Sequence, residues 1–77
     1  MELSLGEKIR LLREERELSQ TELGNAVGMT QRKVSYLECG KYEPGLEDLR
    51  QLCSFFQVSA DYLLGFPKAL PYPRKRK

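Results

Sequence analysis

The chain has 77 residues, enough for one small hydrophobic core but not for a deep apolar pocket, so we expect no small-molecule ligand. It contains no histidine, its carboxylates are scattered over predicted helix faces, and neither cysteine has a second potential metal ligand at a usable spacing. We therefore expect no catalytic site, no metal and no cofactor. No stretch approaches the roughly 18 apolar residues of a membrane span, and the N-terminus lacks the regions of a signal peptide, which predicts a cytoplasmic protein.

Charge is distributed unevenly along the chain. The formal net charge is +2, yet residues 1–67 carry 8 Lys and Arg against all 11 Asp and Glu, a net charge of −3. The remaining positive charge lies in the last ten residues. A protein that coats nucleic acid generally would be positive over its whole surface, so any contact with DNA must be local.

The first predicted helix covers residues 5 to about 17. Ser4 and Glu7 have the spacing of a capping box, and apolar residues recur on one helix face: Leu5, Ile9 and Leu12. The opposite face is rich in charge. Two pairs of opposite sign stand four residues apart and can form ion pairs: Arg10 with Glu14, and Arg13 with Glu17.

Residues 18–40 predict two short helices joined by a glycine turn. Ser19 caps the first helix, which presents one apolar face and ends at Gly28; the face consists of Leu23, Ala26 and Val27. Thr30 caps the second helix, and Gly40 ends it. Two capped helices three residues apart are typical of a helix-turn-helix unit.

Two more helices are predicted after this unit. The fourth covers Leu46 to about Phe56, with Gly45 as a weak cap; its inner stripe is Leu46, Leu49, Cys53 and Phe56, with Leu52 beside them. Ser59 caps the fifth helix and Gly65 ends it. We therefore predict an all-α, compact five-helix bundle in residues 1–66, followed by a proline-rich basic tail in residues 67–77.

The stretch from about Leu5 to Leu64 resembles the helix-turn-helix family of phage repressors and Cro proteins, which includes many small bacterial regulators. The resemblance rests on motifs in one register: Leu18-Ser19-Gln20, Glu22-Leu23, Gly28, Val34-Ser35, Glu38, Gly40-Lys41 and Glu43-Pro44. It implies a transcriptional regulator, which we expect to be a repressor that binds double-stranded operator DNA as a homodimer. The alternative is a protein-interaction module, an antirepressor or antitoxin-like partner that keeps the fold without reading DNA.

The resemblance also implies which residues contact DNA. In the family the third helix enters the major groove, and the base-contacting positions match Gln31, Arg32, Lys33 and Tyr36. Arginine suits guanine O6 and N7, and glutamine suits adenine N6 and N7. Phosphate contacts are expected from Gln20, Thr30, Ser35 and Lys41. The terminal cations Arg74, Lys75, Arg76 and Lys77 have two interpretations, a solvated end or an arm along the phosphate backbone, and we favour the arm.

Several structural expectations follow from the same resemblance. Arg13 and Glu38 should form an ion pair between the first and third helices. Glu17 and Gln57 stand where the family has glycine, so both should adopt a left-handed conformation. Gly24 stands where the family favours alanine at a close helix contact. Apart from the resemblance, the dimer contact is expected at the end of the fifth helix and after it, because a small monomer should not need to expose so many apolar residues there: Tyr62, Leu64, Phe66 and Leu70. Cys39 should be an ordinary free thiol.

Overall fold

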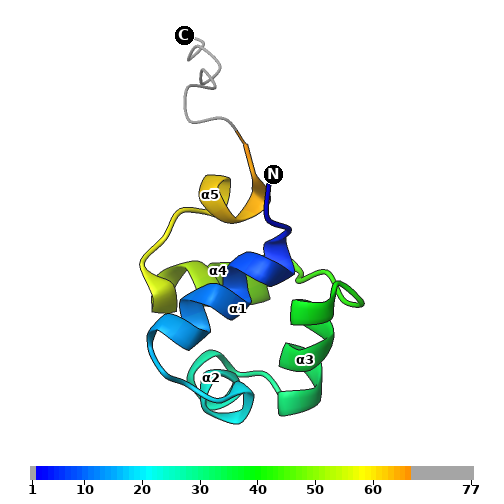
Figure 1. Ribbon diagram of the computed structural model, residues 1–77, viewed down its shortest axis with the longest axis vertical. Coiled ribbons are helices and arrows are strands. Elements are labelled where there is room, and N and C mark those ends of the chain that lie inside the picture. Colours follow the sequence, from blue (N-terminus) through cyan, green and yellow to red (C-terminus); the bar gives the residue numbers. More distant parts are fainter. Residues whose placement is uncertain (1, 67–77) are drawn as a thin grey trace, which may run out of the picture.

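Residues 2–66 are the part of the chain that the computed structural model describes, and they form five α-helices and no strand (Figure 1). The helices are α1 (Leu5–Glu15), α2 (Gln20–Val27), α3 (Gln31–Cys39), α4 (Leu46–Phe56) and α5 (Ala60–Leu64). The predicted all-α, five-helix fold is confirmed, with α1 ending two residues before the expected end at Glu17. The predicted basic tail, residues 67–77, lies outside the described residues.

Side-chain caps begin four of the five helices where the sequence predicts them. At α1, Glu7 N donates to Ser4 Oγ at 3.2 Å and Ser4 N donates to Glu7 Oε1 at 2.8 Å, which completes a capping box. Ser19 forms the same box at α2, and Thr30 and Ser59 cap α3 and α5. Each cap satisfies backbone amides that have no partner within the helix. The α4 helix begins at Gly45 without a side-chain cap.

Left-handed residues end the helices and redirect the chain. Gly28, Gly40 and Gly65 have φ values of 78°, 82° and 82°. Glu17 and Gln57 adopt the same region with φ values of 57° and 59°, which confirms the expectation from the family's glycine positions. A Cβ atom is crowded in this conformation, so these two residues are strained where a glycine would not be.

The core lies where all five helices meet. Its nine buried apolar residues are Ile9, Leu23, Val27, Met29, Val34, Leu37, Leu52, Phe56 and Leu63. Four other residues predicted on the inner faces are partly buried against this core: Leu5, Leu12, Leu49 and Cys53. Two residues predicted there are exposed. Ala26 is exposed, because α2 buries Gly24 beside Leu23 instead. Leu46 is 80% exposed, because α4 packs on the core through Leu52 and Phe56, with Leu49 partly buried beside them. Cys53 is half-buried against the core, and this burial raises the pKa of its thiol.

Two glycines allow close contacts around α3. A Cβ atom on Gly24 would collide with the carbonyl oxygen of Met29 in the turn before α3. A Cβ atom on Gly6 would lie 2.7 Å from the carbonyl oxygen of Glu38 and closer still to that of Leu37, at the end of α3. The expected close approach at Gly24 is therefore present. It is so tight that the alanine favoured by the family would require the turn to shift.

Replacing Glu17 by glycine should stabilise the fold. The substitution relieves a left-handed conformation in an exposed residue, so we expect the free energy of unfolding to rise by about 1 kcal/mol. Chemical denaturation of Glu17→Gly measures the change. Glu17→Ala is the control, because it removes the same charge but keeps the Cβ atom, and equal stability of the two variants would contradict the strain.

Candidate nucleic-acid interface

The α2 and α3 helices and the turn Gly28-Met29-Thr30 form one unit at the end of the molecule opposite α5 (Figure 1). Met29 is buried in this turn, and α3 buries Val34, Leu37 and Glu38. The opposite face of α3 is open to solvent: Gln31, Arg32, Tyr36 and Cys39 are exposed, and Ser35 is half-buried. The structure thus presents most of the predicted reading residues on one accessible helix face.

A nearly buried ion pair joins α1 to α3. Arg13 Nε donates to Glu38 Oε2 at 2.6 Å and Arg13 Nη2 donates to Glu38 Oε1 at 3.0 Å. The side chains are only 12% and 4% exposed. Arg13 also donates to the carbonyl oxygen of Leu18 at 2.8 Å, and the hydrogen bonds to Glu38 raise the pKa of the guanidinium. The expected bridge is confirmed, and it replaces the alternative pair of Arg13 with Glu17.

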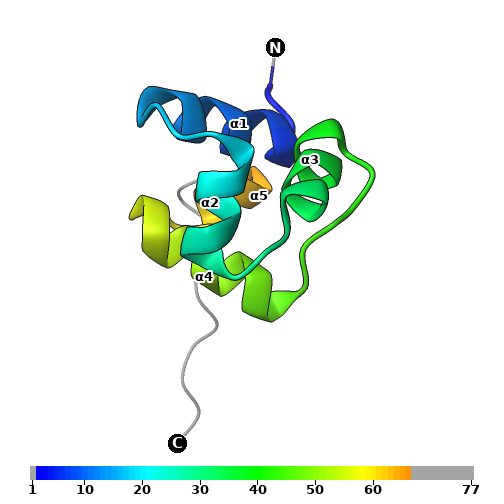
Figure 2. The ribbon, with the colours of Figure 1, turned by 90° about the horizontal axis from the view of Figure 1, so that it is seen from below.

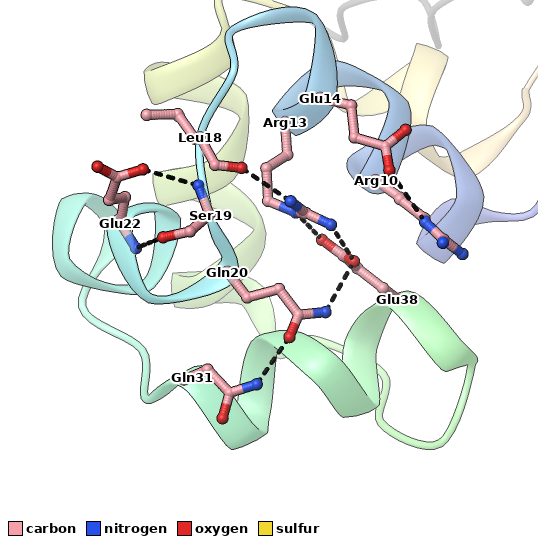
Figure 3. A network of polar contacts seen from close by, with 9 residues as sticks. All are labelled: Arg10, Arg13, Glu14, Leu18, Ser19, Gln20, Glu22, Gln31 and Glu38. Atoms are coloured by element: carbon pink, nitrogen blue, oxygen red, sulfur yellow. Dashed lines mark hydrogen bonds and ion pairs between the residues drawn. The ribbon is translucent and has the colours of Figure 1, made fainter.

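This ion pair continues to the predicted DNA-facing side of α3 through two glutamine side chains (Figure 3). Gln20 Nε2 donates to Glu38 Oε1 at 3.1 Å, and Gln20 Oε1 accepts from Gln31 Nε2 at 2.7 Å. An ionised carboxylate can only accept, so Glu38 turns the NH₂ group of Gln20 inward and its oxygen toward Gln31. Gln31 therefore keeps its oxygen and one N–H for an outside partner.

The structure directs Lys33 away from the other predicted reading residues. Its Nζ lies 3.0 Å from Asp48 Oδ2 in the first turn of α4 and 5.0 Å from the centroid of the Tyr42 ring. The Tyr42 hydroxyl donates to the same carboxylate oxygen at 2.5 Å. The hydrogen bonds to Asp48 and Tyr42 raise the pKa of Lys33. The pKa of Asp48 is lowered, mainly by the Tyr42 hydrogen bond and further by Lys33. A base contact from Lys33 would require this ion pair to open.

Most cations in residues 2–66 have partners within the protein. Arg10 pairs with Glu14 and Arg50 with Glu47, while Lys8 and Arg16 donate to backbone carbonyl oxygens of α5 and α4. With Arg13 and Lys33 also paired, two cations of the described chain have side chains without an ion pair or hydrogen bond: Arg32 and Lys41. Both lie on α3 or directly after it, and Lys41 Nζ is 6.0 Å from the centroid of the Tyr36 ring. Available positive charge is therefore concentrated at α3.

Three of the four residues predicted to form a dimer contact lie within the described chain. Tyr62, Leu64 and Phe66 are 47%, 47% and 51% exposed, around and just after the end of α5. Leu70, the fourth residue of this prediction, lies outside the described residues, as do Arg74, Lys75, Arg76 and Lys77.

Residues 2–66 contain no group of three or more side chains that could hold a metal ion. None of the helices in this part of the chain is long and apolar enough to cross a membrane.

Sequence reasoning did not find the two links that the structure adds to the site. The hydrogen bond between Gln20 and Gln31 and the ion pair between Lys33 and Asp48 each join side chains of different helices. The only sequence signal was the position of each glutamine at the first residue of its helix, which places both near the turn.

Removing the carboxylate of Glu38 should destabilise the protein strongly. Glu38→Ala leaves Arg13 with an unpaired charge in a largely shielded position, and we expect a loss of about 3–5 kcal/mol in the free energy of unfolding. Thermal and chemical denaturation would measure it. Glu14→Ala removes a carboxylate from an exposed pair and should cost less than about 0.5 kcal/mol. Similar losses for the two variants would contradict the role of the buried pair.

The sequence and the structure were both compared with known proteins, and both matches are to helix-turn-helix proteins. Residues 4–63 match the model of a helix-turn-helix domain family. The chain is 38% identical over 60 residues to repressor protein C2 of Salmonella phage P22, covering 78% of this chain and 28% of that protein. It is 34% identical over 59 residues to the SPbeta prophage-derived uncharacterized HTH-type transcriptional regulator YonR of Bacillus subtilis, covering 77% of this chain and 55% of that protein.

The chain therefore spans about a quarter and about half of the lengths of these two relatives. Among solved structures, the P22 c2 repressor in complex with a synthetic operator superposes with a TM-score of 0.78 at 36% identity, over 82% of this chain and 96% of that one. The five helices thus have the fold of a phage repressor DNA-binding domain. The chain belongs to the helix-turn-helix domain family.

Proposed function

We propose that this protein is a sequence-specific DNA-binding transcriptional regulator, a repressor, that places α3 in the major groove of operator DNA. The observation that carries the proposal is the concentration of available positive charge at α3. Of the cations in residues 2–66, only Arg32 and Lys41 have side chains without an ion pair or hydrogen bond, and they lie on α3 and just after its C-cap. The P22 repressor, with the same fold, was solved on an operator.

The proposed reading residues differ in what they offer to DNA. Arg32 is exposed and suits the O6 and N7 acceptors of guanine, while Gln31 suits adenine through its remaining oxygen and N–H. The Tyr36 edge can contact a thymine methyl group or a phosphate. We leave Lys33 out of this set because its ammonium group is held by Asp48.

Phosphate contacts would position α3 without reading sequence. We assign them to Thr30, Ser35 and Lys41, and to the N–H of Gln20 that Glu38 does not take. The N-terminal end of α2 adds backbone amides to the same site. The activity is binding to DNA and requires no catalysis.

The rival function is a protein-interaction module, which the net charge of −3 in residues 1–67 favours. Such a module has no reason to leave cations unpaired on α3. DNA binding with sequence preference separates the two functions.

We further propose that the protein acts as a homodimer. One recognition helix reads too few base pairs for useful selectivity, and a two-fold dimer reads two half-sites about one or more helical turns apart. Tyr62, Leu64 and Phe66 are large apolar side chains that a lone small domain has little reason to expose together.

Arg32→Ala and Lys41→Ala should weaken DNA binding in different ways. On DNA taken from upstream of the gene that encodes this protein, Arg32→Ala should reduce the binding free energy by about 1–3 kcal/mol and relax the preference at one base pair. Lys41→Ala should weaken specific and mixed-sequence DNA by similar factors, with a log K versus log[salt] slope shallower by about 0.9. Equal loss on both DNAs for Arg32→Ala would show that it reads no base.

Dimer formation should appear in both the footprint and the mass of the complex. We expect protection of two half-sites separated by about 10–10.5 base pairs or a multiple of that, and a sedimenting species with two chains per duplex. Tyr62→Ser with Leu64→Ser should weaken binding to the full site far more than to an isolated half-site. Protection of one half-site by a monomer would contradict the dimer.

A further inference from the structure

One carboxylate oxygen, of Asp48, contacts two side chains, one from the recognition helix α3 and one from the loop that follows it. Asp48 Oδ2 lies 3.0 Å from Lys33 Nζ and accepts the hydrogen bond of the Tyr42 hydroxyl at 2.5 Å. The Tyr42 ring in turn faces the lysine ammonium at 5.0 Å. The three residues come from α3, from the loop of residues 40–45 that leads to α4, and from the first turn of α4 (Figure 2).

This cluster removes one cation from the charge available at α3. Lys33 directly follows Arg32 in the sequence, and without Asp48 its flexible four-carbon stem could carry the ammonium toward the exposed edge of the helix. In the structure the Lys33 side chain is 38% exposed and that of Asp48 18%, so the pair is accessible but already formed. The raised pKa of Lys33 and the lowered pKa of Asp48 have the directions expected for such a pair.

Phosphate contacts determine how strongly a protein binds DNA of arbitrary sequence. Each cation that neutralises a phosphate releases counterions and steepens the slope of log K against log[salt] by about 0.9. A lysine already neutralised by a carboxylate of its own protein makes no such contribution. If Lys33 stays paired, this face offers two cations to phosphates, Arg32 and Lys41. If Lys33 is released, it offers three.

We propose that Asp48 is a positioning residue that restrains sequence-independent DNA binding by holding Lys33 away from the phosphate backbone. The inference rests on the proposed function, because it concerns the same DNA-binding face. Tyr42 supports Asp48 by fixing the carboxylate with its hydroxyl and by placing its ring beside the ammonium.

The test compares Asp48→Asn with the full-length wild-type chain on a mixed-sequence 30-base-pair duplex (about three helical turns) over a range of salt concentrations. Asparagine keeps the shape and can still accept the Tyr42 hydrogen bond, but it no longer attracts Lys33. The variant should show a slope steeper by about 0.9 and bind up to about 8-fold more tightly at 0.1 M salt. An unchanged slope would overturn the proposal.

Glu47→Gln is the matched control. It removes the same charge from the same helical turn, but Glu47 pairs with Arg50, which lines the groove between α4 and α5. Its slope should equal that of the wild type. A slope as steep as that of Asp48→Asn would show that net charge alone is responsible, which contradicts the specific role of Asp48.

Lys33→Met, made alone and together with Asp48→Asn, completes a double-mutant cycle that shows whether Asp48 acts through Lys33. In the Asp48→Asn background it should remove the whole gain in slope. In the wild-type background it should leave the slope unaltered, whereas a decrease of about 0.9 would show that Lys33 already contacts phosphate and would overturn the proposal. Circular dichroism melting of each variant confirms that the fold is kept.

The proposed function can fail separately from this inference. If the wild-type chain bound neither its own upstream DNA nor the mixed-sequence duplex, the proposed function would be rejected, and the role of Asp48 with it. Normal wild-type binding with equal slopes for all variants would reject the role of Asp48 alone.

Discussion

The ion pair between Arg13 and Glu38 is the interaction on which the position of α3 and of its exposed face depends. A carboxylate with only 4% of its side chain exposed is costly unless it is paired and hydrogen-bonded. Glu38 meets this requirement with Arg13 from α1 and Gln20 from α2. Because these partners come from two helices, α3 is held to both. Through Gln20, the buried charge of Glu38 also orients the amide of Gln31 on the outer surface.

Close backbone packing fixes the same helix from two sides. Gly6 lets α1 approach the carbonyl groups at the end of α3, and Gly24 lets α2 approach the turn before it. A side chain at either position would collide with backbone, which moves less easily than a flexible side chain. The polar network and these two contacts therefore act together: the glycines set the distance between helices, and the ion pair sets the rotation of α3.

Internal pairing explains how an acidic body can have a local positive region at the proposed DNA-binding face. Residues 1–67 have a net charge of −3, which at long range disfavours approach to DNA. Yet in the described chain the cations outside α3 and its adjoining loop are held by carboxylates or carbonyl oxygens. What remains is a small positive region at Arg32 and Lys41. Its strength depends on whether Asp48 keeps Lys33 paired.

The sequence by itself determined the helices and their ends. Ser4, Ser19 and Ser59 cap amides a few residues away, so short-range interactions sufficed to predict where these helices begin. The left-handed Glu17 and Gln57 were instead predicted from the glycine positions of the family that the sequence resembles. Together with the family resemblance, this also predicted the fold and the exposed face of α3.

Only the tertiary structure decided which side chains meet across helices. Helical periodicity indicates which residues share a face, but not how far a neighbouring helix covers that face. For this reason Ala26 and Leu46 were predicted to be in the core and are exposed. Likewise, Lys33 could equally have faced DNA, and its pairing with Asp48 depends on where the first turn of α4 lies beside α3. That position is set by the packing of the whole bundle, which no local pattern encodes.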